Sequence, residues 1–416
     1  MKALTFGDSA LRWLLCKTTG LVTPRVYWSW LSNLRLREIP EPVLPNGQWV
    51  KLRTLLGGIC GTDLGIIFQR NHPGSMLRAF AGCPMGLGHE NVAIIDQVGD
   101  QVPGWSAGMR VVVEPSLSCV ARGVSPPCPQ CAAGRESLCD SFIDGGGFPA
   151  GAMIGLNNFT SGSWAPCFVA HHSQLHAVAD AIADEQAVVI DPVACSLHGV
   201  LRRRPRSDET VLVQGAGIIG LGVVMSLRAL GFDGTVWALV RSARQAERMR
   251  GFGADHAMVV PRAASAAERY DRVAESVGGR RVAGPFGNQI LLGGFDVVYD
   301  CVGSGPSLTD AMKFARPGGA VVALGTSGIS LVETTPLWFC ELELVGAFGR
   351  QMESVGGRRV HTYDLLTEWM QSGRITLDGL LTHTFAVGDY KRALSLLSRP
   401  SRDRSRVIKV AFDHRA

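Results

Sequence analysis

The stretch VLVQGAGIIGLG, at residues 211–222, constrains the fold of this chain more than any other feature. An apolar run typical of a buried strand leads directly into a G-x-G-x-x-G turn, and a helix-length apolar segment follows. The first glycine permits a tight turn, the second leaves space for a pyrophosphate, and the third lets helix and strand pack closely. The pattern therefore predicts a dinucleotide-binding turn. Its predicted binding residues are Gly215, Gly217, Ile218, Ile219 and Gly220.

The surrounding sequence predicts two kinds of domain. From about residue 210, short apolar runs such as TVWALVR, FDVVYDCVG and AVVALG alternate with helix-length segments, a pattern typical of βαβ units and a parallel sheet. From about residue 35 to 195, β-type segments such as WVKLRTLL and RVVVEP are broken by Gly and Pro, which indicates a β-rich domain. The segment 11–34 has no clear period, and we assign it to no element.

The residues after the second predicted strand of the parallel sheet favour NADP over NAD. An NAD site usually carries a carboxylate about 20 residues beyond the glycines, where it binds the ribose 2′-OH. Here Val240 stands at that place and is followed by Arg241, Ser242 and Arg244, whose guanidinium and hydroxyl groups suit a 2′-phosphate. The alternative is that these arginines are simply solvated at a strand end.

Composition excludes several classes of protein. With 46% hydrophobic residues, 19% charged residues and a net charge of +5, the chain is an ordinary globular protein without a strong basic patch. We expect the basic run 202–206 to be a solvated surface loop and predict no nucleic-acid partner. No apolar run approaches 18 residues and no signal peptide is evident, so we expect no membrane partner. The 11 cysteines, an odd number, favour a reducing compartment, and we expect the cytoplasm.

Two groups of residues have side chains that bind zinc. Cys60, His89 and Glu90 offer a thiolate, an imidazole and a carboxylate. Four further cysteines lie within residues 119–139. In a reducing compartment such clustered thiols bind metal more often than they form disulfides.

Taken in order along the chain, these motifs resemble the zinc-dependent medium-chain alcohol and polyol dehydrogenase family. The resemblance implies a GroES-like β-rich catalytic domain formed by residues 1–194 and 341–416, with an inserted Rossmann domain, a doubly wound parallel sheet, at residues 195–340. The motifs that carry it are CGTD (60–63), GHE (88–90), CPQCAAGRESLC (128–139), DPVACSLHG (191–199), VLVQGAGIIG (211–220) and FDVVYDCVG (295–303).

The resemblance also implies a catalytic zinc site. Cys60 and His89 would be ligands, and Glu90 matches a residue that is a ligand in polyol-type members. Asp191 falls where relatives place Cys or Glu, and because it is one methylene shorter than Glu it would hold a zinc-bound water rather than contact the metal.

Thr62 and Asp63, which follow Cys60 closely, match catalytic positions of the family. Thr62 matches the hydroxyl that relays the substrate proton, and Asp63 matches the carboxylate that orients the histidine ligand. Gly65 stands where many relatives have a relay histidine, so the proton must leave by another route. The 28 residues between Cys60 and His89 form a longer connection than usual, and we expect it to reshape the substrate entrance.

The four cysteines within residues 119–139 match the structural zinc lobe of the family, with one departure. Cys128, Cys131 and Cys139 fit the last three ligands, but Ser125 stands where the first ligand is expected. Cys119 is the nearby thiol that could replace it, provided that the residues between loop out. A site closed by four cysteines has no open position for substrate, so these thiols would hold structure. The alternative is an empty lobe with reduced thiols.

Together these features predict a zinc-dependent oxidoreductase that transfers hydride between NADP(H) and a small-molecule alcohol or carbonyl substrate. A second possibility is an NADPH-dependent reductase of an activated C=C bond, and a third is a non-catalytic NADPH-binding or zinc-lobe interaction protein. The family resemblance further implies a homodimer or homotetramer.

Overall fold

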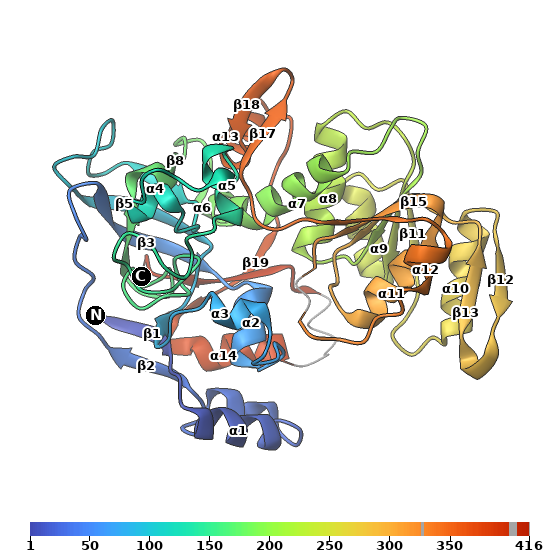
Figure 1. Cartoon of the computed structure of the whole chain (residues 1–416), viewed down its shortest axis with the longest axis horizontal. Coiled ribbons are helices and arrows are strands. Elements are labelled where there is room, and N and C mark those ends of the chain that lie inside the picture. Colours follow the sequence, from blue (N-terminus) through green and yellow to red (C-terminus); the bar gives the residue numbers. More distant parts are fainter. Residues whose placement is uncertain (326–327, 399–405, 416) are drawn as a thin grey trace. The chain divides into compact units, whose positions relative to one another are not determined.

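The chain folds into two compact units, which are coloured along the sequence in Figure 1. Unit 1 comprises Met1–Asp191 and Arg350–Ala416, and unit 2 comprises Pro192–Gly349. The structure, a computed structural model, describes residues 1–325, 328–398 and 406–415.

The unit boundaries differ from the expected ones at 194/195 and 340/341. The first difference is small, because helix α7 (Ile190–Arg202) carries the chain out of unit 1. The second difference, at the end of unit 2, is explained by strand pairing. Strand β16 (Glu343–Gly346) pairs in parallel with β15 (Ala315–Ala323), so residues 341–349 belong to the parallel sheet of unit 2 and not to the catalytic domain.

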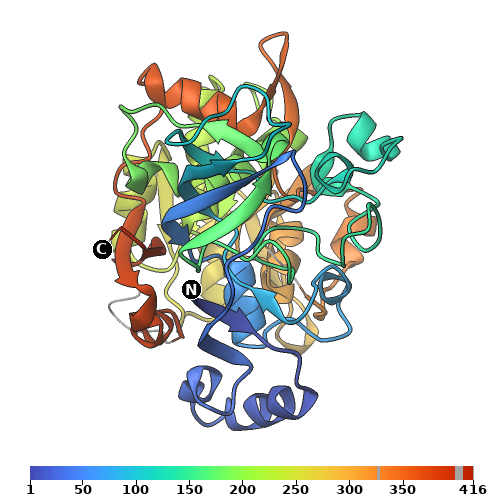
Figure 2. The same cartoon turned by 90° about the vertical axis from the view of Figure 1, so that its left-hand side faces the viewer.

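Unit 1 is built on a seven-stranded sheet in the order β19-β20-β3-β5-β6-β8, with β7 also paired to β3 (Figure 2). The long strand β3 pairs with β5, β7 and β20, and it is buried along most of its length. The strands are β3 (Trp49–Gly58), β5 (Asn91–Val98), β6 (Arg110–Val113), β7 (Cys167–His171), β8 (Leu175–Ala177), β19 (Leu381–Ala386) and β20 (Lys409–Asp413).

Smaller elements of unit 1 surround this sheet. A three-stranded sheet in the order β2-β1-β4 joins β1 (Lys2–Phe6), β2 (Leu34–Glu38) and β4 (Met85–Gly86), and a hairpin joins β17 (Met352–Val355) and β18 (Arg358–His361). The helices are α1 (Ala10–Thr19), α2 (Gly61–Ile67), α3 (Met76–Ala79), α4 (Cys119–Arg122), α5 (Pro129–Ala132), α6 (Asp184–Ala187), α13 (Thr362–Gln371) and α14 (Tyr390–Ser398).

The core of unit 1 forms around large aromatic side chains from its strands and from the segments between them. The ring of Trp164 packs edge-on against that of Phe412, with 5.0 Å between ring centroids, and Phe68 lies in the same buried cluster. A second cluster forms around Trp49 on β3. Burial of these large side chains fixes the strands that carry the candidate site.

Unit 2 is a six-stranded parallel sheet in the order β11-β10-β9-β14-β15-β16. The apolar runs predicted a parallel sheet, and the family resemblance implied that it is doubly wound. Its central strands are buried on both faces, which explains why they are apolar without alternation. The other strands that form it are β9 (Val211–Gln214), β10 (Val236–Val240), β11 (His256–Val259) and β14 (Phe295–Asp300).

Helices alternate with the strands of unit 2, and serine caps begin three of them. An additional antiparallel hairpin, β12 (Arg280–Ala283) and β13 (Gln289–Leu292), was not anticipated from the sequence. The helices are α8 (Ile218–Ala229), α9 (Ala243–Gly251), α10 (Ala266–Ser276), α11 (Gly305–Phe314) and α12 (Thr335–Phe339).

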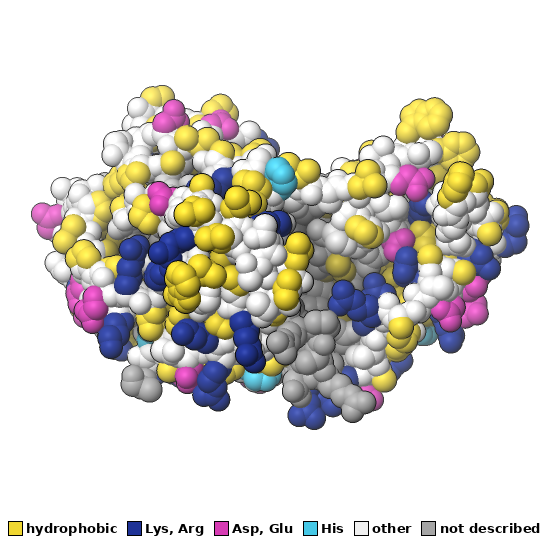
Figure 3. Space-filling view, turned by 90° about the horizontal axis from the view of Figure 1, so that it is seen from below, with side chains coloured by type: hydrophobic (Ala, Val, Ile, Leu, Met, Phe, Trp, Pro, Cys, Tyr) yellow, Lys and Arg dark blue, Asp and Glu magenta, His cyan; other side chains and the backbone are white. Residues whose placement is uncertain are grey.

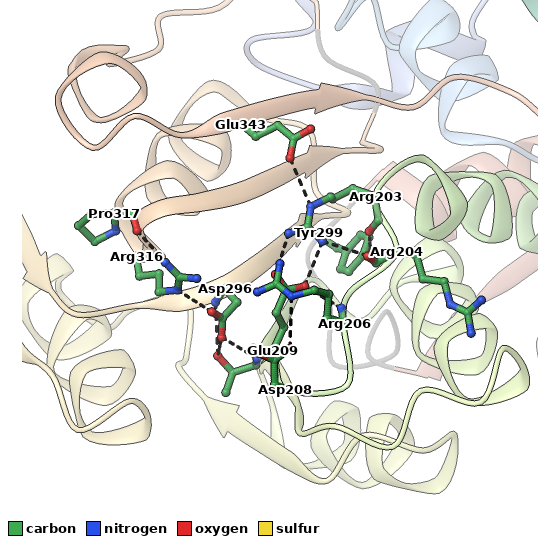
Figure 4. A network of polar contacts seen from close by, with 11 residues as sticks. Arg203, Arg204, Arg206, Asp208, Glu209, Asp296, Tyr299, Arg316, Pro317 and Glu343 are labelled. Atoms are coloured by element: carbon green, nitrogen blue, oxygen red, sulfur yellow. Dashed lines mark hydrogen bonds and ion pairs between the residues drawn. The ribbon is translucent and has the colours of Figure 1, made fainter.

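The basic run 202–206 takes part in a folded polar network of unit 2, so the expectation of a solvated loop was only partly right (Figure 4). The guanidinium group of Arg203 binds Glu209 at 2.8 Å and Glu343 at 3.3 Å, and Arg206 also binds Glu209 at 2.8 Å. The Tyr299 hydroxyl donates to the carbonyl of Arg203 at 2.7 Å. Arg203 and Arg206 are therefore paired with carboxylates within the unit.

Candidate active site

The start of helix α2 positions Cys60, Thr62 and Asp63. Cys60 is the N-cap residue, and its N–H donates to Oδ2 of Asp63 at 2.9 Å. A carboxylate in the first turn is favourable because it satisfies a free N–H and faces the positive end of the helix. Sγ of Cys60 lies 3.7 Å from the hydroxyl oxygen of Thr62. Local helix capping therefore brings the thiol, the hydroxyl and the carboxylate together.

A glycine turn brings His89 to the same place. Gly88 has φ +91°, and a side chain there would meet the ring of Trp164 at 2.3 Å, so both backbone and packing require glycine. The buried His89 follows, with Nδ1 lying 3.6 Å from Oδ1 of Asp63. Burial acts to lower the pKa of His89, but the neighbouring Asp63 and Cys60 outweigh it and hold that pKa well above its usual value.

The ligand atoms of Cys60, His89 and Glu90 all lie within 4.8 Å of one another. His89 and Glu90 are buried, and Cys60 is partly exposed. Because Asp63 faces Nδ1 of His89, the other ring nitrogen is available as a ligand. A thiolate, an imidazole and a carboxylate in one buried cluster form a donor set that fits zinc.

Glu90 has a partner that the sequence did not predict, the ammonium group of Lys409 on β20, with which it forms a buried ion pair. Burial raises the pKa of Glu90 although Lys409 acts in the opposite direction. Burial acts to lower the pKa of Lys409, but the carboxylate reverses this and raises it. A sequence signal was present, because Lys409 interrupts the apolar run VIKVAF. A lysine at a buried strand position requires a buried anion.

Asp191 is not grouped with the three candidate ligands. Its Oδ1 forms an ion pair with the guanidinium group of Arg350 at 2.6 Å and accepts a hydrogen bond from the Tyr363 hydroxyl. Arg350 also lies 3.5 Å from the buried carboxylate of Glu114. The structure therefore engages Asp191 in an ion-pair network whose other members the sequence analysis missed. Nothing local in the sequence links them, because they come from distant segments.

The structure brings Cys119, Cys128, Cys131 and Cys139 together, with all four sulfur atoms within 4.8 Å of one another. Cys119 begins the short helix α4, and its sulfur lies 3.6 Å from that of Cys139 and accepts the N–H of Cys128 at 3.4 Å. Between Cys119 and Cys128 the chain forms α4, whose C-cap residue, Gly123, is in the left-handed conformation. This geometry fits a closed four-thiolate zinc site.

The thiols of this lobe differ in acidity. Burial acts to raise the pKa of Cys128, but N–H donors of Cys131 and Asp140 and the neighbouring thiols outweigh it and lower that pKa to about 7. Burial raises the pKa of Cys139 to about 11. Without metal, the thiols of Cys128 and Cys139 therefore do not ionise over the same pH range.

The buried guanidinium group of Arg122 organises the loop beside the four thiols. It donates to the carbonyls of Leu117 at 3.0 Å, Phe142 at 3.1 Å and Gly151 at 2.7 Å. These carbonyls belong to the segments that enter and leave the lobe, so one side chain links them.

In unit 2, the turn after β9 has the predicted backbone features. Gly215 has φ +106°, and a side chain on Gly220 would meet the carbonyl oxygen of Gly215 at 1.9 Å. The space beside Gly217 is open, and Gly217 caps α8, whose first residues are Ile218 and Ile219. The open space at a helix N-terminus is suited to a phosphate group.

The predicted 2′-phosphate residues follow the neighbouring strand. β10 pairs in parallel with β9, so Arg241 and the glycine turn lie at the same edge of the sheet. Arg241 and Arg244 are exposed, while Ser242 caps α9 by accepting the N–H of Gln245 at 3.4 Å. Val240 is buried and leaves no carboxylate at the strand end.

Comparison with known proteins agrees with this geometry. The alcohol dehydrogenase GroES-like domain matches residues 46–180, and the zinc-binding dehydrogenase domain matches residues 219–370. L-idonate 5-dehydrogenase of Vitis vinifera is 28% identical and sorbitol dehydrogenase of Arabidopsis thaliana 27% identical, each over 92% of this chain and 94% of the relative.

Solved structures share the fold over nearly the whole chain. Galactitol-1-phosphate dehydrogenase from Escherichia coli superposes with a TM-score of 0.70 at 20% identity, over 99% of this chain and 100% of that one. A zinc-binding dehydrogenase from Sinorhizobium meliloti 1021, bound to NADP, has a TM-score of 0.67 at 25% identity, over 91% and 95% of the two chains.

The chain belongs to the zinc-dependent medium-chain alcohol and polyol dehydrogenase family. It is an oxidoreductase of the zinc-dependent alcohol dehydrogenase type that uses zinc and a nicotinamide cofactor. The predicted family and the predicted pairing of a GroES-like domain with a Rossmann domain are confirmed. Among the described residues, no helix is long and apolar enough to cross a bilayer.

Proposed function

We propose that the protein interconverts a secondary alcohol of the polyol or sugar-acid type and the corresponding ketone, with NADP(H) as its preferred cofactor. The observation that carries the proposal is the buried cluster of Cys60, His89 and Glu90 beside the Thr62 hydroxyl. The L-idonate, D-arabinitol and sorbitol dehydrogenases among its relatives support the substrate class.

Residues of this chain have distinct roles in the proposed reaction. When bound, zinc supplies Lewis acidity that makes an alcohol easier to deprotonate. Cys60, His89 and Glu90 would hold the ion, and Asp63 keeps the His89 ring oriented. The partly exposed Thr62 hydroxyl would take the substrate proton. It would pass the proton directly toward water, because Gly65 stands where many relatives have a relay histidine.

The NADP preference is supported by the charge at the end of β10. Exposed Arg241 and Arg244, with Ser242 between them, offer charge-assisted hydrogen bonds to a 2′-phosphate. Arg241→Asp should raise KM for NADPH far more than KM for NADH. Arg250→Asp, in the exposed last turn of α9, is the matched control and should leave both KM values near wild type. Equal effects of Arg241→Asp on both cofactors would refute the preference.

Substrate class and zinc dependence can be tested together. Polyols, sugar acids and aromatic alcohols would be screened with NADP and NAD, with zinc content measured on the same sample. Cys60→Ala should abolish turnover while NADPH binding, measured by fluorescence, is retained. Undiminished turnover in Cys60→Ala would favour zinc-independent chemistry, such as reduction of an activated C=C bond.

Compartment and assembly remain part of the proposal. All 11 cysteines are free thiols, which supports a reducing compartment such as the cytoplasm. A homodimer or homotetramer is proposed from the family, and light scattering on the purified protein would test it.

A further inference from the structure

The insertion, residues 9–37, comprises most of the connection between β1 and β2 and the first four residues of β2, and it presents an apolar helix face to solvent. Leu11, Leu14 and Leu15 of α1 are 68%, 55% and 38% exposed. Their spacing places them on one face of the helix, whereas the buried Cys16 lies on the other side. Such a stripe normally faces a core, but here the packed side of the helix is the opposite one.

The exposed apolar surface continues beyond the helix. Leu21 and Val22 in the following loop are each 87% exposed, and Trp30 is 79% exposed. The loop at Trp30 is held in place, because its carbonyl accepts hydrogen bonds from Arg12, at 2.7 Å, and from Arg35. Figures 1 and 2 both show α1 and this loop, in dark blue, on the outside of unit 1 beside β1 and β2.

The charged side chains within the insertion are all cationic, and Asp8 and Glu38 flank it. Residues 9–37 contain no Asp or Glu, and no salt bridge found among the described residues pairs their cations with a carboxylate. Figure 3, seen from below Figure 1, shows apolar and basic side chains interleaved on the face that carries α1, with few acidic ones. The five cations are Arg12, Lys17, Arg25, Arg35 and Arg37.

This combination distinguishes between possible partners. In a symmetric dimer formed through this patch, each copy would place its cations against those of the other, which is unfavourable. A nucleic acid would bind the cations but leave the exposed leucines and valine without an apolar partner. An anionic bilayer offers both, since its headgroups attract Lys and Arg, its acyl region accepts aliphatic side chains, and Trp favours the boundary between them.

We propose that residues 9–37 bind the protein to the surface of a membrane containing anionic phospholipid. Helix α1, with 10 residues, is too short to span a bilayer but can lie in the interface with its leucine face toward the acyl chains. The proposal replaces the expectation of no membrane partner, which rested on the lack of a spanning segment. It is independent of the proposed catalytic function, whose residues lie elsewhere in the chain.

The test uses the full-length protein and vesicle co-sedimentation. The wild type should sediment with vesicles of phosphatidylglycerol and phosphatidylcholine, be released by high salt, and stay in solution with phosphatidylcholine alone. Leu21→Ser with Val22→Ser removes two side chains that are each 87% exposed, and Arg25→Glu reverses an exposed charge. Each should lower the partition coefficient roughly fivefold or more.

Controls separate membrane binding from other effects. Phe286→Ser truncates a fully exposed aromatic residue in unit 2 and should leave partitioning unchanged. Circular dichroism and turnover of the variants should match wild type. The proposal would be overturned if the wild type sedimented equally with both vesicle types. It would also be overturned if Phe286→Ser lowered the partition coefficient as much as the insertion variants do. So would a change of oligomeric state in the insertion variants without lipid, which would identify the patch as a subunit interface.

Discussion

The ammonium group of Lys409 and the carboxylate of Glu90 form an ion pair in which both side chains are buried. β20, which carries Lys409, and the turn before β5, which carries Glu90, are far apart in sequence. The C-terminal strand therefore completes the candidate metal cluster by neutralising one of its ligands before metal binds.

Lys409→Met should lower the free energy of unfolding of metal-free protein by about 3–5 kcal/mol, because it leaves a buried carboxylate without its cation. Adding Glu90→Gln should recover part of that loss. Urea unfolding measures both, with Lys391→Met, at an exposed position, as control. If the double variant is no more stable than Lys409→Met, the pair is not the source of the effect.

Asp63→Asn should weaken zinc binding at the catalytic cluster by about 10- to 100-fold. The amide oxygen can still accept the N–H of Cys60, but the negative charge that faces His89 is lost. Titration with a chelator measures zinc affinity, and Asp233→Asn, at an exposed position, is the control. Unchanged affinity in Asp63→Asn would show that Asp63 acts only as a helix cap.

Metal analysis should find two zinc ions per chain, one for each ligand group. Cys131→Ser should remove the ion of the four-cysteine lobe and leave the other, and Cys119→Ser should do the same because its thiol completes the set. Cys340→Ser, outside both groups, should retain two. One zinc per chain that persists in Cys131→Ser would show that the lobe is empty.

Arg122→Met should destabilise the protein by about 2 kcal/mol or more, because several buried carbonyls lose their donor. Thermal unfolding measures this loss, and Arg374→Met, at an exposed position, should have little effect. Near-equal stability of the two variants would mean that water replaces the guanidinium group.

Protein stability should fall as the pH is lowered from about 6.5 toward 4. Burial lowers the pKa of His171 to about 4 from its usual 6.5, so in this interval the unfolded chain binds more protons than the folded one. His171→Asn should reduce the slope, since asparagine does not titrate yet can still cap the turn at Ser173. Urea unfolding across this pH range tests the effect, with the exposed His72→Asn as control. An identical slope in wild type and His171→Asn would contradict it.

Local sequence patterns predicted the strands that are buried on both faces of the sheet. β9 and β14 follow from short apolar runs, VLV and VVY, and the turn at Gly215 follows from the steric needs of its glycines. The hairpin of β12 and β13 was missed, because its residues are largely exposed and carry no strong period.

The sequence by itself determined the family, the doubly wound sheet of unit 2, and the residue types of both zinc-binding groups, because these depend on short motifs with fixed spacing. Only the tertiary structure decided that Lys409 neutralises Glu90, that Arg350 and Tyr363 engage Asp191, and that Cys119 joins the other three thiols of its group. Such pairings bring together residues from separate segments. Their energy comes from burial and charge in three dimensions, which no local pattern records.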